Sequence, residues 1–281
     1  MNTLQDKIEL FLDEVKDAVA TEKLLLPSLP DIALEIRAEC EKDDASAEQI
    51  ANVISRDPAM SVRLLQVANS SLYRTHHPAE NIQTAITRLG LKLVRDLIIG
   101  LSMKQLYRTS NPVIAERFRE LWLASTKTAA IARILCQNLS HLDPEQAMLA
   151  GLVHNIGALP IILMAEDDDD LFDDPQALCR VVFKMQGEVG AYIFQNWHFP
   201  DYMIRVAEEC YNFRRHHNGL ADYVDVIQVA LIQGSIYTGL ECPEDWSSVS
   251  AFERLGILTD TPMLDIEENK LIFDETTSLF K

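Results

Sequence analysis

Apolar residues recur three and four positions apart along most of this chain, which is the spacing of amphipathic helices. The pattern is clearest over residues 54–105. There Asp57 and Pro58 mark a helix start, because aspartate caps a first turn and proline fits the first helical position. Gly90 separates two further apolar runs. We therefore predict three or four closely joined helices in this stretch and an all-α fold.

The pattern divides the chain into three parts. Residues 1–25 carry one narrow apolar stripe, which predicts an amphipathic helix that docks on this domain or on a second copy of the chain. Residues 26–240 form the main helical domain, and residues 241–281 form a less regular C-terminal extension. In that extension we expect a short helix over 249–255, whereas the segment 265–276 (DIEENKLIFDET) allows a strand or hairpin.

Composition narrows the class of protein. Lysine and arginine number 25 and aspartate and glutamate 43, so the net charge is −18, which repels nucleic-acid phosphates and anionic membranes. We expect no nucleic-acid partner and no membrane partner. The five cysteines lack CxxC spacing, and the acidic N-terminal segment is unlike a signal peptide. Together these features predict a cytoplasmic protein.

One uncharged run, from Ala147 to Ala165, is long enough to span a membrane. It contains His154, Asn155 and Pro160, a costly set of residues in lipid. We therefore predict a buried core helix that ends near Pro160.

The residues of 54–105 are also the most specific in the sequence. The order "DP", "RLLQVANSSLY" and "AITRLG", followed by an apolar helix, closely resembles the HDOD domains of bacterial signalling proteins. The "LPSLP" before the first core helix resembles the opening of the same domains, and the resemblance covers roughly residues 26–239. It implies an HD-like multi-helix bundle related to the HD metal-dependent phosphohydrolases.

The resemblance also implies where a metal site would lie. HD phosphohydrolases hold divalent ions with histidine and aspartate side chains, and the ion lowers the pKa of a bound water. The segment "GLVHNIG" matches the HD motif but reads His154-Asn155, and Ala124 stands where a first histidine is expected. The helix that would carry the last aspartate has none between Val226 and Leu240. We therefore expect a degenerate site with no metal and no cofactor; a metal, if bound, would be a divalent cation.

Other polar residues are candidates for a ligand or partner surface. Arg63 and Asn69 interrupt an apolar helix, and their structural alternatives are an ion pair with a carboxylate and a cap at the helix end. His198 follows a tryptophan and is more simply explained as a packed or hydrogen-bonded side chain. His216 and His217 follow, by about six residues, the position where the family places a histidine pair. They are either that pair displaced by an insertion or a surface pair at a helix end.

From these observations we expect a signalling protein that binds a partner protein in trans, or a small ligand in the vacated pocket, and that catalyses no reaction. The N-terminal helix offers a surface for a homo-oligomer. The alternative function is a divalent-metal-dependent phosphohydrolase acting on a nucleotide or phosphoester. Such an enzyme would draw its ligands from His154, His198, His216 and His217.

Overall fold

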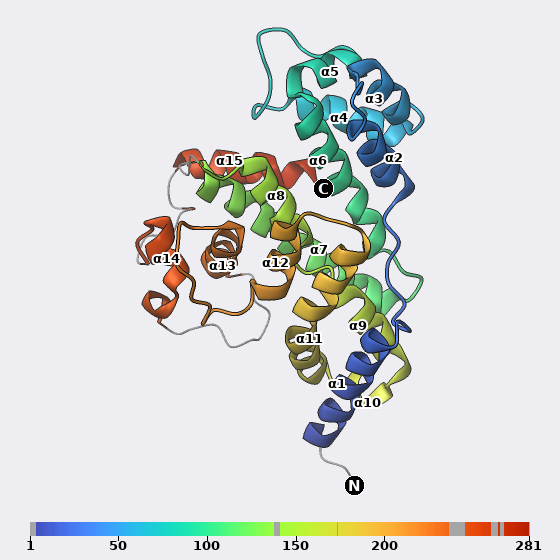
Figure 1. The fold of residues 1–281 in the computed structure, drawn as a ribbon, viewed down its shortest axis with the longest axis vertical. Coiled ribbons are helices and arrows are strands. Elements are labelled where there is room, and N and C mark those ends of the chain that lie inside the picture. Colours follow the sequence, from blue (N-terminus) through green and yellow to red (C-terminus); the bar gives the residue numbers. More distant parts are fainter. Residues whose placement is uncertain are drawn as a thin grey trace.

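The fold is built from helices throughout the described part of the chain (Figure 1). The computed structural model describes residues 4–137, 141–172, 174–235, 245–259, 264 and 267–280, and none of these residues lies in a strand. The all-α prediction is confirmed. The α-helices are α1 (Leu4–Ala20), α2 (Asp31–Cys40), α3 (Ala47–Ile54), α4 (Pro58–Asn69), α5 (Ile82–Leu89), α6 (Leu91–Met103), α7 (Pro112–Cys136), α8 (Pro144–Val153), α9 (Ala158–Met164), α10 (Asp169–Phe172), α11 (Pro175–Asn196), α12 (Asp201–Glu209), α13 (Tyr223–Gln233), α14 (Ser250–Leu255) and α15 (Glu267–Leu279). Short 3₁₀ segments are η1 (Lys104–Tyr107), η2 (Ala165–Asp167) and η3 (Trp246–Ser248).

The stretch 54–105 folds as its caps predict. The Asp57 carboxylate accepts a hydrogen bond from the backbone N–H of Met60 at 3.0 Å, and Pro58 occupies the first turn of α4. Gly90 separates α5 from α6 with a φ of 81°, which favours glycine because a side chain would be strained there. Helices α2 to α5 gather around the first half of α6 at one end of the molecule (Figure 1).

The N-terminal helix α1 finds its partner within the same chain. Its apolar stripe packs against α11 and is buried in the core of the main domain (Figure 1). The buried residues of this stripe are Ile8, Phe11, Leu12 and Val15. The predicted docking of this stripe on the same domain is confirmed for these four residues.

The uncharged run folds as two helices, so the prediction of one helix ending near Pro160 is wrong. Helix α8 ends at Val153, a turn follows over 154–157, and Pro160 lies in the first turn of α9, where a missing N–H costs little. The segment Pro144–Met164 is long and apolar enough to cross a membrane, but its most apolar window is 89% buried inside the protein. It therefore has the burial of a core segment.

Close backbone contacts position this turn. A Cβ added to Gly157 would lie 2.1 Å from the carbonyl oxygen of Gln186 in α11. A Cβ added to Gly151 would lie 2.8 Å from the Cα of Ala129 in α7. The two glycines therefore allow the α8–α9 turn to lie directly between α7 and α11.

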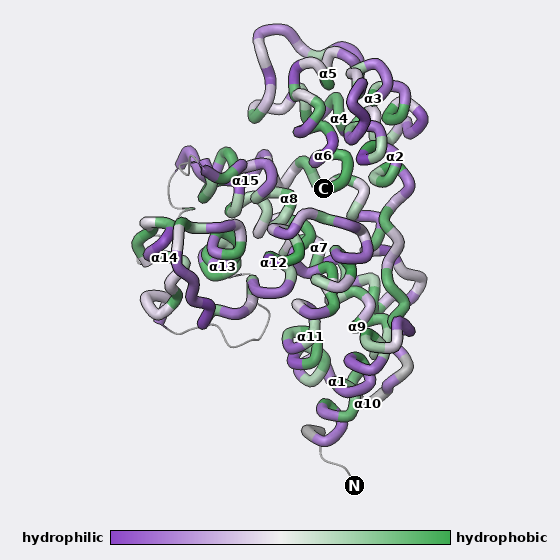
Figure 2. Tube along the Cα trace, in the orientation of Figure 1, coloured by the Kyte–Doolittle hydropathy of each residue, from purple (hydrophilic) through white to green (hydrophobic). Residues whose placement is uncertain are grey.

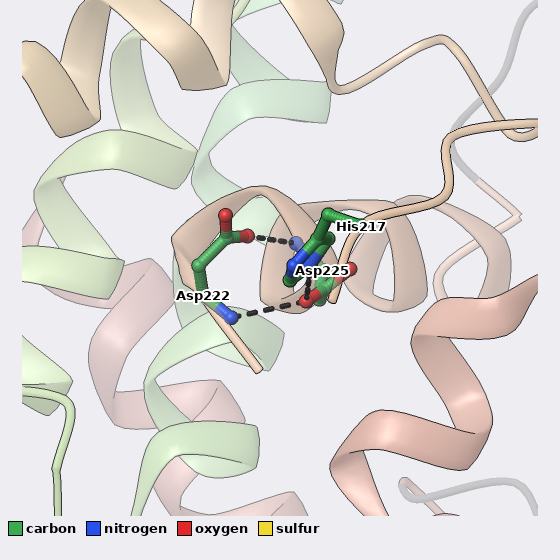
Figure 3. Close-up of side chains that lie close together, drawn as sticks. All are labelled: His217, Asp222 and Asp225. Carbon is green, nitrogen blue, oxygen red and sulfur yellow. Dashed lines mark hydrogen bonds and ion pairs between the residues drawn. The ribbon is translucent and has the colours of Figure 1, made fainter. Parts of the chain in front are cut away.

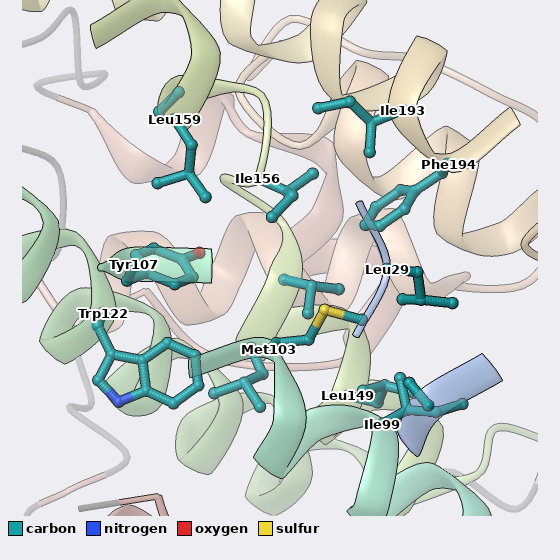
Figure 4. Close-up of a cluster of buried hydrophobic side chains, with 14 of the residues drawn as sticks. Leu29, Ile99, Met103, Tyr107, Trp122, Leu149, Ile156, Leu159, Ile193 and Phe194 are labelled. Atoms are coloured by element: carbon teal, nitrogen blue, oxygen red, sulfur yellow. The ribbon is translucent and has the colours of Figure 1, made fainter. Parts of the chain in front are cut away.

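Two hydrophobic cores hold the helices together. The main core joins α1 to α6, much of α7 to α9, and α11. Figure 4 shows part of it, with Trp122 beside Tyr107 and with Met103 and Ile156 among other buried side chains. The second core lies around α13 and α14 and includes one face of the C-terminal half of α7. Hydrophobic and hydrophilic stretches alternate along the helices (Figure 2), as the amphipathic pattern predicts.

In the C-terminal extension, most of the described residues over 245–259 and 267–280 lie in helices, and residues 265–266 lie outside the described part. Helix α14 matches the short helix expected over 249–255, but α15 replaces the expected strand or hairpin, so that expectation is wrong. The apolar run misled the prediction, because Leu271 is 66% exposed whereas Thr276 and Phe280 are buried against α7. The indole N–H of Trp122 donates to the carbonyl oxygen of Phe280 at 3.1 Å. Long-range packing therefore selects the helix.

Candidate functional site

A cavity of about 310 Å³ lies between α7, the α8–α9 turn, α11 and the segment that follows α12. We call this cavity the HD pocket, because it contains the position of the HD motif. Fully buried side chains form its base and more exposed ones form its rim. The lining residues are Arg117, Glu120, Leu121, Ala124, His154, Asn155, Ile162, Pro175, Leu178, Cys179, Val182, Gln186 and Tyr211. The structure thus brings together Ala124, His154 and Asn155.

Asn155 is held firmly at the base of the pocket and is 1% exposed. Its Oδ1 accepts a hydrogen bond from the hydroxyl of Tyr107 at 2.8 Å and lies 3.0 Å from the hydroxyl of Ser125. The Ser125 hydroxyl shares its single proton between this oxygen and the carbonyl oxygen of Leu121, at 2.9 Å. Burial raises the pKa of Tyr107, so its phenol stays protonated and remains a donor. The neutral amide oxygen is therefore already used by protein hydroxyl groups.

His154 presents a neutral imidazole to the pocket. Its Nδ1 lies 2.7 Å from the carbonyl oxygen of Gly151, and because a carbonyl only accepts, Nδ1 carries the proton. The ring is 1% exposed, and burial lowers the pKa of His154 to about 4. Nε2 therefore keeps a free lone pair near pH 7. The ring of Tyr211 lies beside it, with centroids 5.8 Å apart.

Little else around His154 can bind a cation. Ala124 offers only a methyl group from α7, and the carboxylate in the lining, that of Glu120, belongs to the exposed rim. Within the described part of the chain, no group of three histidine, cysteine, aspartate or glutamate side chains converges at the HD pocket. A divalent ion would gain too few charged ligands there to replace its water.

A second group of side chains has residue types that can bind a metal, but its carboxylates are paired with arginines. His217, Asp222 and Asp225 place potential ligand atoms within 4.8 Å of one another at the start of α13 (Figure 3), and we call them the α13 cluster. His217 Nε2 lies 3.0 Å from Asp225 Oδ2. Arg215 binds Asp222 at 2.6 Å, and Arg254 binds Asp225 at 2.7 Å. Two guanidinium groups therefore already compensate both carboxylates.

The α13 cluster has a clear structural role. Asp222 and Asp225 form a reciprocal capping box, in which each carboxylate accepts the backbone N–H of the other at 3.0–3.1 Å. Burial alone would raise the pKa of Asp225, but hydrogen bonds from Arg254, Asp222 and His217 hold it below its ordinary value. The ionised carboxylate ties α14 and the preceding loop to α13. Asp225 stands one residue before Val226, just ahead of the segment where the family pattern places its last aspartate, so the pattern does not mark it.

The remaining candidate residues lie outside the HD pocket. His216 is exposed, and His198 is an exposed side chain whose Nδ1 lies 2.9 Å from the carbonyl oxygen of Asn196. His217 belongs to the α13 cluster, in the loop before α13, and is half-buried rather than on the surface at a helix end. These three histidines therefore do not join His154 around one site.

Neither Arg63 nor Asn69 has the structural role considered for it, an ion pair and a helix cap respectively. Among the described residues no carboxylate pairs with Arg63. Its positive charge acts instead on Lys104, whose pKa is lowered first by burial and then by Arg63. Asn69 bonds both backbone groups of Ala79, donating to its oxygen at 3.0 Å and accepting from its nitrogen at 2.7 Å. Asn69 therefore pins the loop between α4 and α5 rather than capping a helix.

Three residues at or next to the HD pocket were not singled out as site residues. Gln186 lines the pocket and Tyr107 bonds Asn155 at its base; both come from distant parts of the sequence, and no local motif marks them. Tyr211 carried a signal, since the family histidine pair is expected near Cys210 and Tyr211. The structure places Tyr211 beside His154, and Gln186 lines the same cavity.

Residues 26–213 match the model of the HDOD domain. The chain belongs to the HDOD family. A solved structure with this HDOD fold, a candidate metal-dependent phosphohydrolase from Shewanella amazonensis SB2B, is 28% identical, with a TM-score of 0.86 and coverage of 98% of this chain and 99% of that one. An HDOD domain protein of unknown function from Geobacter sulfurreducens is 20% identical, with a TM-score of 0.66 and coverage of 97% and 98%. The second likeness shows the fold alone.

One curated relative is much longer than the segment that it shares with this chain. A protein of Treponema pallidum (strain Nichols) without an assigned function is 26% identical over 207 residues. The match covers 69% of this chain but 38% of that relative. The chain therefore spans well under half the length of this relative, and the match concerns only that shared part.

Proposed function

We propose that this HDOD protein is a non-catalytic signalling protein of the bacterial cytoplasm, which transmits a signal by binding a partner protein in trans. The single observation that carries the proposal is the state of Asn155. Its oxygen, at the position of a metal-binding aspartate in the HD motif, is bonded by the hydroxyl of Tyr107 and lies beside that of Ser125. A neutral oxygen with these neighbours is a weak metal ligand.

Electrostatics support the same proposal. A hydrolytic metal site lowers the pKa of a bound water only while charged or imidazole ligands keep the ion in place. At the base of the HD pocket, the potential metal ligands that are 1% exposed are the imidazole of His154 and the neutral amide of Asn155. Ala124, which also lines the pocket, offers no ligand atom. The function that then remains for the helical frame is recognition of another protein. HDOD membership supports signalling, and the missing ligands support the absence of catalysis.

The rival function is a divalent-metal-dependent phosphohydrolase. The likeness to the Shewanella amazonensis candidate phosphohydrolase, at 28% identity over nearly the whole chain, favours it. The cation would then bind the α13 cluster rather than a shared histidine site, because His217, Asp222 and Asp225 are the described residues that converge. Binding would have to displace the guanidinium groups of Arg215 and Arg254.

A metal-binding and hydrolysis experiment tests the two functions against each other. Purified protein is incubated with Mn²⁺, Mg²⁺ or Zn²⁺, and bound metal, melting temperature and hydrolysis of bis(p-nitrophenyl) phosphate are measured. We expect no stoichiometric metal, no metal-dependent increase in melting temperature and no hydrolysis. Hydrolysis that Asp225→Asn abolishes and His154→Phe retains would establish the rival function at the α13 cluster.

Partner binding has its own test. The tagged chain is used to capture proteins from its native bacterium, and each captured protein is then purified and recombined with the chain. We expect a complex of defined stoichiometry by light scattering, with no metal added. If every recombined protein elutes separately from the chain, the partner-binding proposal is wrong.

A further inference from the structure

The walls of the HD pocket are apolar. Leu121 and Ala124 from α7 face Ile162 from α9 and Leu178 and Val182 from α11. Their cavity of about 310 Å³ lies at the lower end of the range of small-molecule sites. Apolar walls of this size favour a ligand that loses water-exposed apolar surface on entry.

The base of the pocket adds one directed polar group. His154 Nδ1 is bonded to the carbonyl oxygen of Gly151, whereas no described residue bonds to Nε2. The ring is 1% exposed and lines the cavity, so this lone pair is available to a molecule inside it. An unbonded acceptor in a buried site favours a ligand that donates a hydrogen bond.

The charges around the pocket disfavour an anion. The cation in the lining, Arg117, lies at the half-buried rim, where its guanidinium donates to the carbonyl oxygen of Phe172 at 2.9 Å and stacks over that ring. Glu120 adds negative charge at the same rim. An anion at the base would lose its hydration without meeting a positive partner.

We infer that the HD pocket binds a neutral, largely apolar small molecule that donates a hydrogen bond to Nε2 of His154. The inference rests on the proposed function in one respect, because it requires that no metal uses this nitrogen. It gives the signalling protein a chemical input. The pocket suits that role because its lining joins Leu121 and Leu178, which belong to or pack on the main core, with Tyr211, which packs on the second core.

Indole is a suitable probe, because it is neutral, aromatic and carries one N–H donor. Its binding to the full chain is measured by isothermal titration calorimetry beside two matched molecules. 1-Methylindole keeps the ring but lacks the donor, and phenyl phosphate supplies an anion. We expect indole to bind about tenfold more tightly than 1-methylindole, the loss that follows from one unmade hydrogen bond at a buried acceptor. Phenyl phosphate should bind more weakly than either.

Substitutions then test whether the probe binds inside the HD pocket. Ala124→Trp fills the cavity and should abolish binding, whereas Leu123→Trp adds the same side chain at a 38% exposed position of the same helix and should leave binding unchanged. His154→Phe keeps an aromatic ring but removes the acceptor, so indole and 1-methylindole should then bind equally. The comparison of ligands on the unmodified chain remains decisive if a variant fails to fold.

Four results would overturn the inference: no binding of indole, equal binding of indole and 1-methylindole to the unmodified chain, equal binding of indole to the chain and to a folded Ala124→Trp variant, or tighter binding of phenyl phosphate. These failures are distinct from failure of the proposed function. Metal-dependent hydrolysis that requires Asp225 contradicts the non-catalytic proposal and leaves the ligand inference standing. Loss of indole binding without any hydrolysis contradicts the ligand inference alone.

Discussion

The base of the HD pocket and the α13 cluster are two groups of polar side chains in one apolar frame. The first group is neutral, whereas the second is charged. At the HD pocket, a neutral His154 and a neutral Asn155 lie at the base. In the α13 cluster, the ionised Asp225 meets Arg254 at 2.7 Å, with His217 on its other oxygen at 3.0 Å. The first contains no charge to compensate, and the second is already compensated.

Ligand-type residues do not by themselves make a metal site. A cation needs negative charge that nothing else neutralises. The HD pocket has the family position without that charge, whereas the α13 cluster has the carboxylates together with two guanidinium groups. Substitutions that add or remove a charge in either region therefore test the comparison directly.

Asp225→Ala should have the largest effect. It leaves the largely buried guanidinium of Arg254 without its carboxylate and removes half of the α13 capping box. Breaking a buried ion pair by removing one partner costs about 3–5 kcal/mol, so the free energy of unfolding in urea should fall by about that amount. The exposed pair of Glu116 and Arg119 supplies the control, and Glu116→Ala should change stability little. A similarly small loss for Asp225→Ala would mean that the cluster does not hold α14 in place.

His154 should make stability depend on pH. Burial lowers its pKa to about 4, from an ordinary value of 6.5, so between these values the unfolded chain binds a proton that the folded chain does not. The contribution is present above pH 6.5 and is lost as the pH falls towards 4, by about 3 kcal/mol in all. His154→Phe should flatten the dependence of urea stability on pH in this window. His76→Phe, at an exposed histidine, should retain it, and equal slopes for the two variants would contradict the prediction.

Local signals in the sequence account for much of the fold. Asp57 and Pro58 start α4 where expected, because a cap and a first-turn proline act on neighbouring backbone groups. The same kind of signal fails for α15, where Leu271 is exposed and full burial falls instead on Thr276 and Phe280. Contacts with α7 decide that helix, and the spacing of apolar residues within 265–276 does not reveal them.

Only the site residues that lie within the family motifs could be predicted from the sequence. Ala124, His154 and Asn155 stand at positions that the family pattern marks, and they do line one cavity. Tyr107 is 48 residues from the amide that it bonds, and that contact depends on how η1 packs against α7. The role of Asp225 was hidden for another reason, since its arginine partners come from separate segments.

Restoring charge at the HD pocket should create a cation site there. Asn155→Asp with Ala124→His adds a carboxylate and an imidazole to His154, and three protein ligands suffice for a catalytic zinc. Binding stabilises by RT ln(1 + [L]/Kd), about 2.7 kcal/mol at a metal concentration of 100 Kd. The double variant should therefore melt at higher temperature with Zn²⁺ or Mn²⁺, and the unmodified chain should not. If neither responds, Ala124 and Asn155 do not face each other closely enough to share an ion.

The smallest effect should come from the hydroxyls around Asn155, and it tests how fully its oxygen is committed. Tyr107→Phe removes one donor but keeps the ring beside Trp122, where the centroids are 5.1 Å apart, so the loss should be about 1 kcal/mol. Ser125→Ala alone should cost a similar amount. Because both hydroxyls serve one buried oxygen, removing both leaves it unbonded, and the double variant should lose more than the sum by about 0.5–1 kcal/mol. Strict additivity in urea denaturation would show that the two hydroxyls act independently, and that the Asn155 oxygen has capacity to spare for a ligand.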